Sequence, residues 1–342
     1  RTRLRQYGEQ DRRIIVCLRD SNGHISAATN TAVSSATGDF LVFLDNDDKL
    51  DREALALFAI YISENPLTDI VYSDDAKIDS AAGGLFNPKF KPDWSPELLL
   101  SYCYVSHLKA LRRELYNDIG GSRLGFEGSQ DHDMLLRASE RARHIGHIPQ
   151  ILYHRRVLPT STAASGHAKP YSFEAGRRAV EEAFSRRGVP CNVVHPEWAL
   201  RAGAGIYVPM MPDDGPSVAL IIPTRNNWRI LDKLLVSLKK TTYRNFRCYI
   251  VDNQSDDPET LDYLGRLQDT VFRIPNRFGG FSFAYVNNEA VRRVTEDLIL
   301  FLNDDVEAID GRWLSQMVGW SRLSGVGAVG ARLLYPDGRV QH

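Results

Sequence analysis

The chain has 342 residues, with 42 lysines and arginines against 43 aspartates and glutamates, which leaves a formal net charge of −1. At about 150 residues per domain, this length predicts two domains. A hydrophobic share of 43% with 25% charged residues excludes disorder, coiled coil and collagen. Because nucleic-acid binders usually carry a basic excess, we expect no nucleic-acid partner.

Short apolar runs alternate with helical patterns along the whole chain, which favours an α/β fold with mostly parallel sheets flanked by helices. The first part predicts strands at 14–18, 40–44, 70–72, 145–148 and 151–154, and helices at 27–36, 52–64, 131–141 and 172–187. The second part predicts strands at 218–222, 248–251, 271–274 and 298–302, and helices at 229–240, 258–267, 284–294 and 313–323.

Glycine and proline interrupt both periodicities between Arg201 and Pro216, which marks a domain boundary. We therefore expect a first unit over 1–205, a linker over 206–216 and a second unit over 217–342. An internal repeat supports two units of one fold. Each copy has an asparagine (Asn30, Asn288) and a helix, followed by an apolar strand and an acidic turn that begins 15 positions later, at Asp45 or Asn303.

The acidic turns suggest a metal or diphosphate site. Asp45, Asn46, Asp47 and Asp48 follow a buried strand, and ligands bind at the carboxyl ends of strands in open α/β sheets. Clustered carboxylates there suit Mg²⁺ or Mn²⁺. The alternative is a solvated turn or a cap for the following helix, and the recurrence at Asn303 weakens that alternative.

Two further positions have a structural and a functional interpretation. Asp131 precedes a predicted helix, where it could cap the helix or act as a general base beside the metal site. His154 ends a predicted strand, where it could be structural or ligate the same metal. Arg155 and Arg156 beside it could hold phosphates.

Other motifs are uninformative or negative. The cysteines, at 17, 103, 191 and 248, form no CxxC pair, and we interpret them as buried thiols of a protein from a reducing compartment. No apolar run approaches the roughly 20 residues that span a bilayer. Gly325 to Gly330 matches GxGxxG, but it follows a helix and leads into a strand, the reverse of a dinucleotide-binding turn. Since the chain begins with Arg1 and stops after a strand-like segment, we expect both ends to be cut.

Together these motifs resemble the inverting family 2 glycosyltransferases of GT-A fold. The chain is especially similar to tandem-domain, rhamnosyltransferase-like bacterial enzymes that build O-antigen and other surface polysaccharides. The segments that carry the resemblance follow the family's order at 22–30, 43–48, 71–75, 90–99, 127–133 and 152–155 in the first unit, and at 221–226, 251–255, 301–305 and 340–342 in the second.

For the first unit, the resemblance implies that Asp45 and Asp47 are the DxD acids. Asp47 would be the metal ligand, and Asp45 would lie nearer the ribose and sugar, with Asn30 also in the nucleotide-sugar site. Asp131 would be the catalytic base that deprotonates the acceptor hydroxyl. His154 would complete the metal site, and Trp94 would be a wall for sugar or acceptor, or simply a core aromatic.

For the second unit, the resemblance implies that Asp252 reads the nucleotide base. Pro223, Thr224 and Asn226 would form the loop under the nucleotide. Asn303 would stand at the first DxD position, and Asp305 at the second as a metal ligand. The first unit would lack its opening strand, and the second everything after His342, so we expect little transferase activity from these 342 residues alone.

The expected activity is transfer of a hexose or deoxyhexose from a UDP- or dTDP-sugar to a growing glycan, free or lipid-linked, with Mn²⁺ or Mg²⁺ as cofactor. We expect a cytoplasmic location, with peripheral association at the inner membrane left open. In one alternative, one unit is catalytic and the other is a non-catalytic nucleotide- or glycan-binding module. A nucleotidyltransferase is a weaker alternative, because the loop after Ile222 lacks the glycines of that class.

Overall fold

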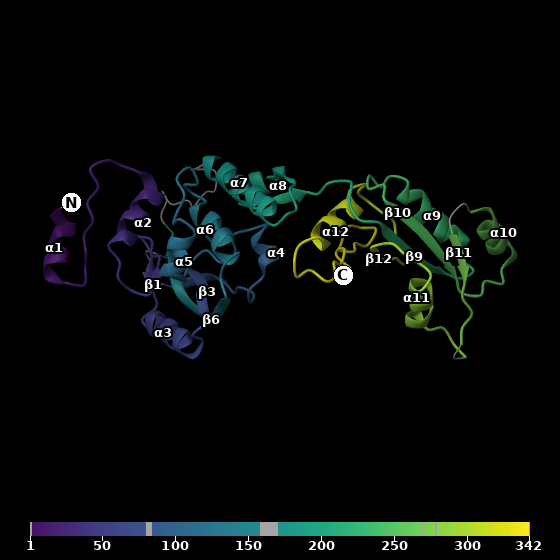
Figure 1. Cartoon of the computed structure of the whole chain (residues 1–342), viewed down its shortest axis with the longest axis horizontal. Helices are drawn as coiled ribbons and strands as arrows, with labels where there is room; N and C mark the ends of the chain where they lie inside the picture. The colour runs from purple at the N-terminus through teal and green to yellow at the C-terminus, as the bar shows by residue number, and fades with distance from the viewer. Residues whose placement is uncertain (1, 80–83, 158–169, 268–269, 278, 342) are drawn as a thin grey trace. The chain divides into compact units, whose positions relative to one another are not determined.

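The structure is a computed structural model that describes residues 2–79, 84–157, 170–267, 270–277 and 279–341 (Figure 1). The chain divides into two compact units, Arg1–Pro209 and Met210–His342. The division follows Gly203 and Gly205, in the stretch where glycine and proline interrupt regular structure.

The first unit alternates helices with strands (Figure 1). Its helices are α1 (Thr2–Gln10), α2 (His24–Ser34), α3 (Ala54–Glu64), α4 (Pro96–Leu99), α5 (Arg113–Asp118), α6 (Gln130–Ser139), α7 (Pro170–Arg186) and α8 (Glu197–Arg201). Its strands are β1 (Phe40–Val42), β2 (Lys49–Leu50), β3 (Thr68–Ile78), β4 (Leu85–Lys89), β5 (Lys109–Arg112), β6 (His144–Arg156) and β7 (Asn192–Val194), and β8 (Val208–Met210) crosses the boundary.

The main sheet of the first unit is mixed, not mostly parallel as expected. Its order is β1-β5-β3-β6-β2, with β4 beside β3. The central pair β3 and β6 is parallel, whereas β1 with β5, β5 with β3, β4 with β3 and β2 with β6 are antiparallel. Periodicity reports which residues are buried and not the direction in which a strand pairs, so the sequence did not reveal this.

Three strand predictions in this unit need correction. Residues 14–18 form no ladder, and Ile15 is 67% exposed, because an apolar run becomes a strand only when a partner accepts its hydrogen bonds. The strands expected at 145–148 and 151–154 are one strand, β6. Its pairing with β3 shifts register between Ile148 and Ile151, where Pro149 cannot donate to the ladder.

The second unit has a fully parallel sheet in the order β11-β10-β9-β12, as expected. Its strands are β9 (Val218–Thr224), β10 (Phe246–Asp252), β11 (Thr270–Arg273) and β12 (Leu298–Phe301). Its helices are α9 (Trp228–Leu238), α10 (Pro258–Arg266), α11 (Phe283–Val291) and α12 (Trp313–Ser321).

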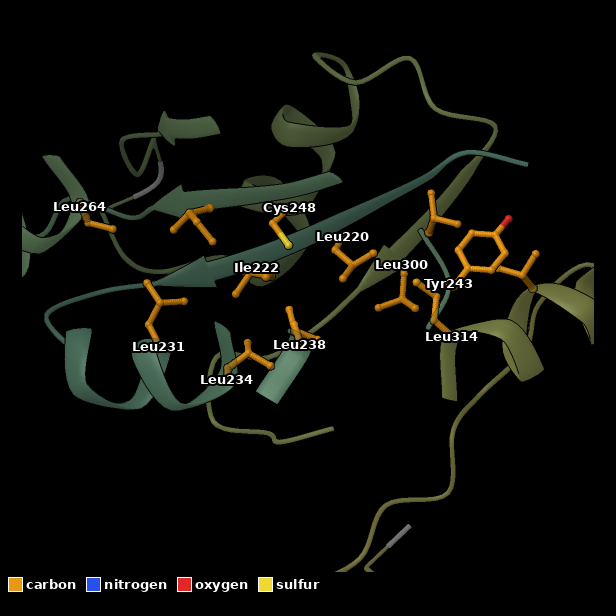
Figure 2. Packing of buried hydrophobic residues seen from close by; sticks show 13 residues of the cluster. Leu220, Ile222, Leu231, Leu234, Leu238, Tyr243, Cys248, Leu264, Leu300 and Leu314 are labelled. Atoms are coloured by element: carbon orange, nitrogen blue, oxygen red, sulfur yellow. The ribbon is translucent and has the colours of Figure 1, made fainter. Parts of the chain in front are cut away.

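The strand β9 is buried on both faces. Leu220 and Ile222 pack with Leu231 and Leu234 of α9 (Figure 2), while Ile221 packs with residues of α11 on the other face. This explains why β9 reads as a continuous apolar run and not as an alternating one. The polar residues of this unit's candidate site follow the carboxyl end of β9, where ligands bind in open α/β sheets.

The two copies of the sequence repeat have the same local structure. In the first, α2 and β1 precede the turn at Asp45; in the second, α11 and β12 precede the turn at Asn303. They differ in pairing, because β1 is antiparallel to β5 and β12 is parallel to β9.

Two sequence expectations concern the chain as a whole. Across the described ranges, no helix is both long enough and apolar enough to cross a bilayer. The four cysteines are free, but only Cys248 is buried and Cys17 is exposed, so the expectation of buried thiols is wrong for Cys17. Cys17 lies in the segment that forms no strand, which leaves it outside the sheet.

Candidate active site

The acidic turn of the first unit is a compact carboxylate group. Ligand atoms of Asp45, Asp47 and Asp48 all lie within 4.8 Å of one another. The buried Tyr153 of β6 holds the turn, since its hydroxyl donates to Asp48 Oδ2 (2.7 Å) and accepts the backbone N–H of Asp45 (3.3 Å). Because β2 pairs with β6, the chain after the turn is fixed against the strand that carries Tyr153.

A cavity of about 400 Å³ opens beside this turn. Its wall brings carboxylates and guanidinium groups together from segments far apart in the chain. The charged residues that line it are Asp45, Asp47, Asp48, Asp131, Arg155 and Arg156. Acids that suit a cation and arginines that suit phosphate oxygens therefore share one cavity.

Asp131 stands at the start of α6 and makes two polar contacts. Its Oδ1 lies 2.7 Å from Nζ of the fully buried Lys109, and its Oδ2 accepts a hydrogen bond from Gln130 Nε2 (3.0 Å). Burial raises the pKa of Asp131, but the charge of Lys109 and the hydrogen bonds from Lys109 and Gln130 outweigh it, so the pKa lies below the usual value. Asp131 is therefore ionised at neutral pH.

The pKa of Asp45 is shifted in the opposite direction. Burial, followed by repulsion from Asp131 and Asp48, raises the pKa of Asp45 to about 6 although Lys109 opposes the shift. His107 Nε2 lies 3.5 Å from Asp45 Oδ2. Burial and then the charge of Lys109 lower the pKa of His107 to about 3, so this imidazole is neutral at physiological pH.

Asp133, two residues after Asp131, is structural. It is almost fully buried and forms ion pairs with Arg123 and Arg137. His132, which lies between Asp131 and Asp133 in the sequence, donates a hydrogen bond from Nε2 to the Leu99 carbonyl (2.6 Å). Of the two aspartates in this segment, Asp131 is the one that lines the cavity.

Three residues predicted for this site do not line the cavity. The amide of Asn30 is used internally, because Oδ1 accepts from Tyr116 (2.7 Å) and Nδ2 donates to the Ser122 carbonyl (2.8 Å). His154 is paired with Lys49 on β2 and is not part of the acidic group found among the described residues. Trp94 is half-buried beside Tyr104, with ring centroids 6.4 Å apart.

The second unit has a cavity of about 360 Å³ at the carboxyl ends of β9 and β12. Pro223, Thr224, Asn303 and Asp305, all predicted for this site, line it. Thr224 Oγ1 donates to Asp304 Oδ2 (2.7 Å). Burial raises the pKa of Asp304, and Asp305 adds to the shift while Thr224 opposes it.

Asp252 and Asn226 do not line this cavity. Asp252 is buried, with Oδ1 accepting the N–H of Ser255 (2.8 Å) and Oδ2 lying 3.6 Å from Arg273 Nε. Asn226 has φ 50°, and its Oδ1 accepts the N–H groups of Asp256 (2.9 Å) and Asp257 (3.0 Å). The Asn226 side chain joins the loop after β9 to the loop after β10, whereas the Asp252 side chain holds the loop after β10 and lies near β11.

The sequence did not point to three residues that shape the first cavity: Tyr153, His107 and Lys109. Lys109 had a detectable signal, since a lysine within the apolar run Leu108 to Leu111 is costly to bury without a partner. Tyr153 had none, because an aromatic residue in a strand is usually a core residue, and no motif in the sequence singles out His107.

The sequence model of Glycosyl transferase family 2 matches residues 1–120 and 219–341. The chain is 41% identical to an uncharacterised protein (y4gI) of Sinorhizobium fredii over 99% of this chain and 37% of that protein. It is 37% identical to the O-antigen biosynthesis protein RfbC of Myxococcus xanthus over 99% of this chain and 26% of that protein. The chain thus spans well under half the length of these relatives.

A solved structure is also similar. Residues 1–349 of TarS from S. aureus, in complex with UDP-GlcNAc, show 18% identity and a TM-score of 0.41 over 52% of this chain and 53% of that chain. The family match covers parts of both compact units, including both acidic turns. The chain belongs to glycosyl transferase family 2.

Proposed function

We propose that the protein is a metal-dependent, inverting glycosyltransferase that moves a sugar from a UDP- or dTDP-sugar to a growing bacterial surface glycan. The observation that carries the proposal is the first cavity, in which Asp45, Asp47, Asp131 and Arg155 face one another in a chain of this family. The relative named for O-antigen biosynthesis supports the glycan as acceptor.

The donor's diphosphate would lie between acids and arginines. The oxygens of Asp45, Asp47 and Asp48 fit Mg²⁺ or Mn²⁺, which prefer carboxylate ligands. When bound there, the cation would offset the negative charge of the departing nucleoside diphosphate. Arg155 is held by Asp75 (2.8 Å) and lines the cavity, where a guanidinium group suits a phosphate oxygen.

Asp131 is the proposed base. It accepts the proton of the acceptor hydroxyl as the acceptor oxygen bonds to the anomeric carbon. The bond from that carbon to the diphosphate oxygen breaks, and its electron pair leaves on the diphosphate. Attack opposite the leaving group inverts the anomeric centre. Asp45 contacts the sugar side of the donor. The roles expected of Asn30 at the nucleotide-sugar, of Trp94 as a wall for sugar or acceptor and of His154 at the metal stay predictions.

We propose that the chain consists of a first unit over 1–205, a linker over 206–216 and a second unit of the same fold over 217–342. The second unit would hold a second nucleotide-sugar site. Thr224, Pro223, Asn303 and Asp305 contact the donor, and Asp305 ligates the metal. Asp252 would read the nucleotide base, and Asn226, whose amide oxygen joins the loop after β9 to the loop after β10, would lie under the nucleotide. The protein would work in the cytoplasm, peripherally at the inner membrane, on a glycan or lipid-linked glycan.

The alternative is that the second unit only binds nucleotide or glycan. Among the residues described as lining its cavity, the acids are Asp304 and Asp305 of one turn, and none comes from a separate helix as Asp131 does in the first unit.

The test is a thermal-shift panel of UDP-, dTDP- and GDP-sugars with and without Mn²⁺, on the full-length protein and its Asp47→Ala and Asp305→Ala variants. We expect Asp47→Ala to abolish Mn²⁺-dependent stabilisation by the donor and to abolish transfer. If Asp305→Ala changed neither binding nor transfer, the binding-module alternative would be preferred. Donor binding unaffected by Asp47→Ala and by chelation would refute the metal site.

A further inference from the structure

Lys109 is a buried charge that is paired with a carboxylate and a carbonyl group. It lies in β5 between apolar neighbours, and its side chain is fully buried. Its ammonium group donates to the Ser106 carbonyl (2.8 Å) and lies 2.7 Å from Asp131 Oδ1. A buried ammonium group is costly unless it is paired, so both contacts are part of why the lysine is tolerated there.

The surroundings of Asp131 show why its carboxylate needs a partner. Asp131 faces Lys109 from β5, His107 from the segment before β5 and Gln130 from its own helix. Asp45 lines the same cavity, and its pKa is raised by the like charge of Asp131. Without a nearby cation, two carboxylates in one partly buried cavity would compete for a proton.

We propose that Lys109 is a positioning residue for transfer: it fixes one oxygen of Asp131 on the rigid strand β5 and leaves the carboxylate ionised toward the acceptor. This inference rests on the proposed role of Asp131 as base. Lys109 lies behind Asp131 and is not among the residues that line the cavity, so it acts through the carboxylate and does not touch substrate.

The geometry also supplies a matched control. Lys91 is a second buried lysine, and its ammonium group donates to the carbonyls of Val105 (2.7 Å) and His107, in the segment that Lys109 also holds. Its ion pair is with Asp75 (3.2 Å) and not with Asp131. Removing Lys91 therefore perturbs the same segment without removing the partner of Asp131.

The experiment compares pH profiles of kcat and kcat/KM in the full-length protein for Lys109→Met, Lys109→Arg and Lys91→Met. In Lys109→Met the pKa of Asp131 should rise, so the acid limb of kcat/KM should move up by about one pH unit or more. We expect kcat to fall about tenfold or more, with the donor KM changed less than about threefold. Lys109→Arg keeps a cation and should keep the acid limb in place. If Lys109→Met does not fold, Lys109→Gln replaces it, because its amide can still donate to Ser106.

Three outcomes are decisive. If Lys109→Met, or Lys109→Gln in its place, changed neither the acid limb of kcat/KM nor the value of kcat, the positioning role would be overturned. The same shift in Lys91→Met would also overturn it, because the effect would then come from the shared segment. The Asp131→Asn variant distinguishes failure of the positioning role of Lys109 from failure of the proposed function. If Asp131→Asn keeps its kcat, Asp131 is not the catalytic base. If Asp131→Asn is inactive but the Lys109 variant is unaltered, Asp131 remains the proposed base and only the role of Lys109 is refuted.

Discussion

At the scale of single residues, the first cavity depends on side chains that do not line it. Tyr153 is buried in β6, yet its hydroxyl joins the two ends of the acidic turn, at Asp45 and Asp48. Residues behind metal ligands commonly change metal affinity by 10-fold or more, because they orient the ligands. The geometry of the carboxylates is thus set by a residue that sequence reasoning treats as core.

Tyr153→Phe tests this directly. Removing the hydroxyl should lower Mn²⁺ affinity about tenfold, because Asp48 and the Asp45 N–H lose their common partner. The free energy of unfolding should fall by about 1 kcal/mol. Isothermal titration with Mn²⁺ and a nucleoside diphosphate measures the first effect, and urea unfolding the second.

The control is Tyr116→Phe, which removes another buried hydroxyl of the same unit, one bonded to Asn30 and Ser122. It should cost similar stability and leave Mn²⁺ affinity unchanged. Equal losses of affinity in the two variants would mean that the Tyr153 hydroxyl has no particular role in the acidic turn.

At the scale of elements, ion pairs hold the mixed sheet at the start of β3. Asp69 is almost fully buried and is paired with Arg112 of β5 (2.8 Å) and with Arg143 before β6 (2.6 Å). The hydrogen bond from Arg143 is the largest cause that lowers the pKa of Asp69, to about 2, against the opposing effect of burial. This one carboxylate links the three central strands of the unit.

Asp69→Asn should lower the stability of the first unit by about 2 kcal/mol at pH 7, since a pKa lowered in the folded state stabilises it by about 1.4 kcal/mol per unit. Because the folded pKa lies below the unfolded one, this contribution is present above about pH 4 and is lost as the pH falls through about 2. Urea unfolding of both proteins from pH 7 to pH 2.5 measures the difference. A difference that stayed constant with pH would show that the ion pairs do not supply it.

At the scale of the whole molecule, the chain has two compact units with separate hydrophobic cores. The second core lies between the parallel sheet and α9, where Leu234 is fully buried (Figure 2). Separate cores allow each unit to unfold without the other.

Leu234→Ala should therefore destabilise the second unit alone, by about 3 kcal/mol, because it leaves a cavity in that core. In differential scanning calorimetry we expect one transition to shift and a second to stay, with donor-induced stabilisation through Asp47 retained. Val236→Ala, on the exposed side of the same helix, should shift neither. A single transition that moved as a whole would contradict independent units.

The sequence predicted the structure correctly where the pattern of buried apolar residues is sufficient to identify an element. The run from Val218 to Ile222 is apolar at every position, so a strand covered on both faces was predictable, and the parallel sheet around it was found. The acidic turn at Asp45 was predictable because carboxylates after a buried strand are rare without a role. The strand prediction for residues 14–18 was wrong, because a strand also requires a partner strand, which composition does not reveal.

The sequence by itself determined the α/β class, the positions of most helices and strands, both acidic turns and the family. These follow from patterns within about 20 residues, where periodicity and turn chemistry act. Only the tertiary structure decided the mixed sheet, the hydrogen bonds that Asn30 and Asp252 form within the protein, and the pairing of Lys109 with Asp131. The physical reason is that strand direction and the partner of a buried charge are settled by contacts between distant segments, which a local pattern does not specify.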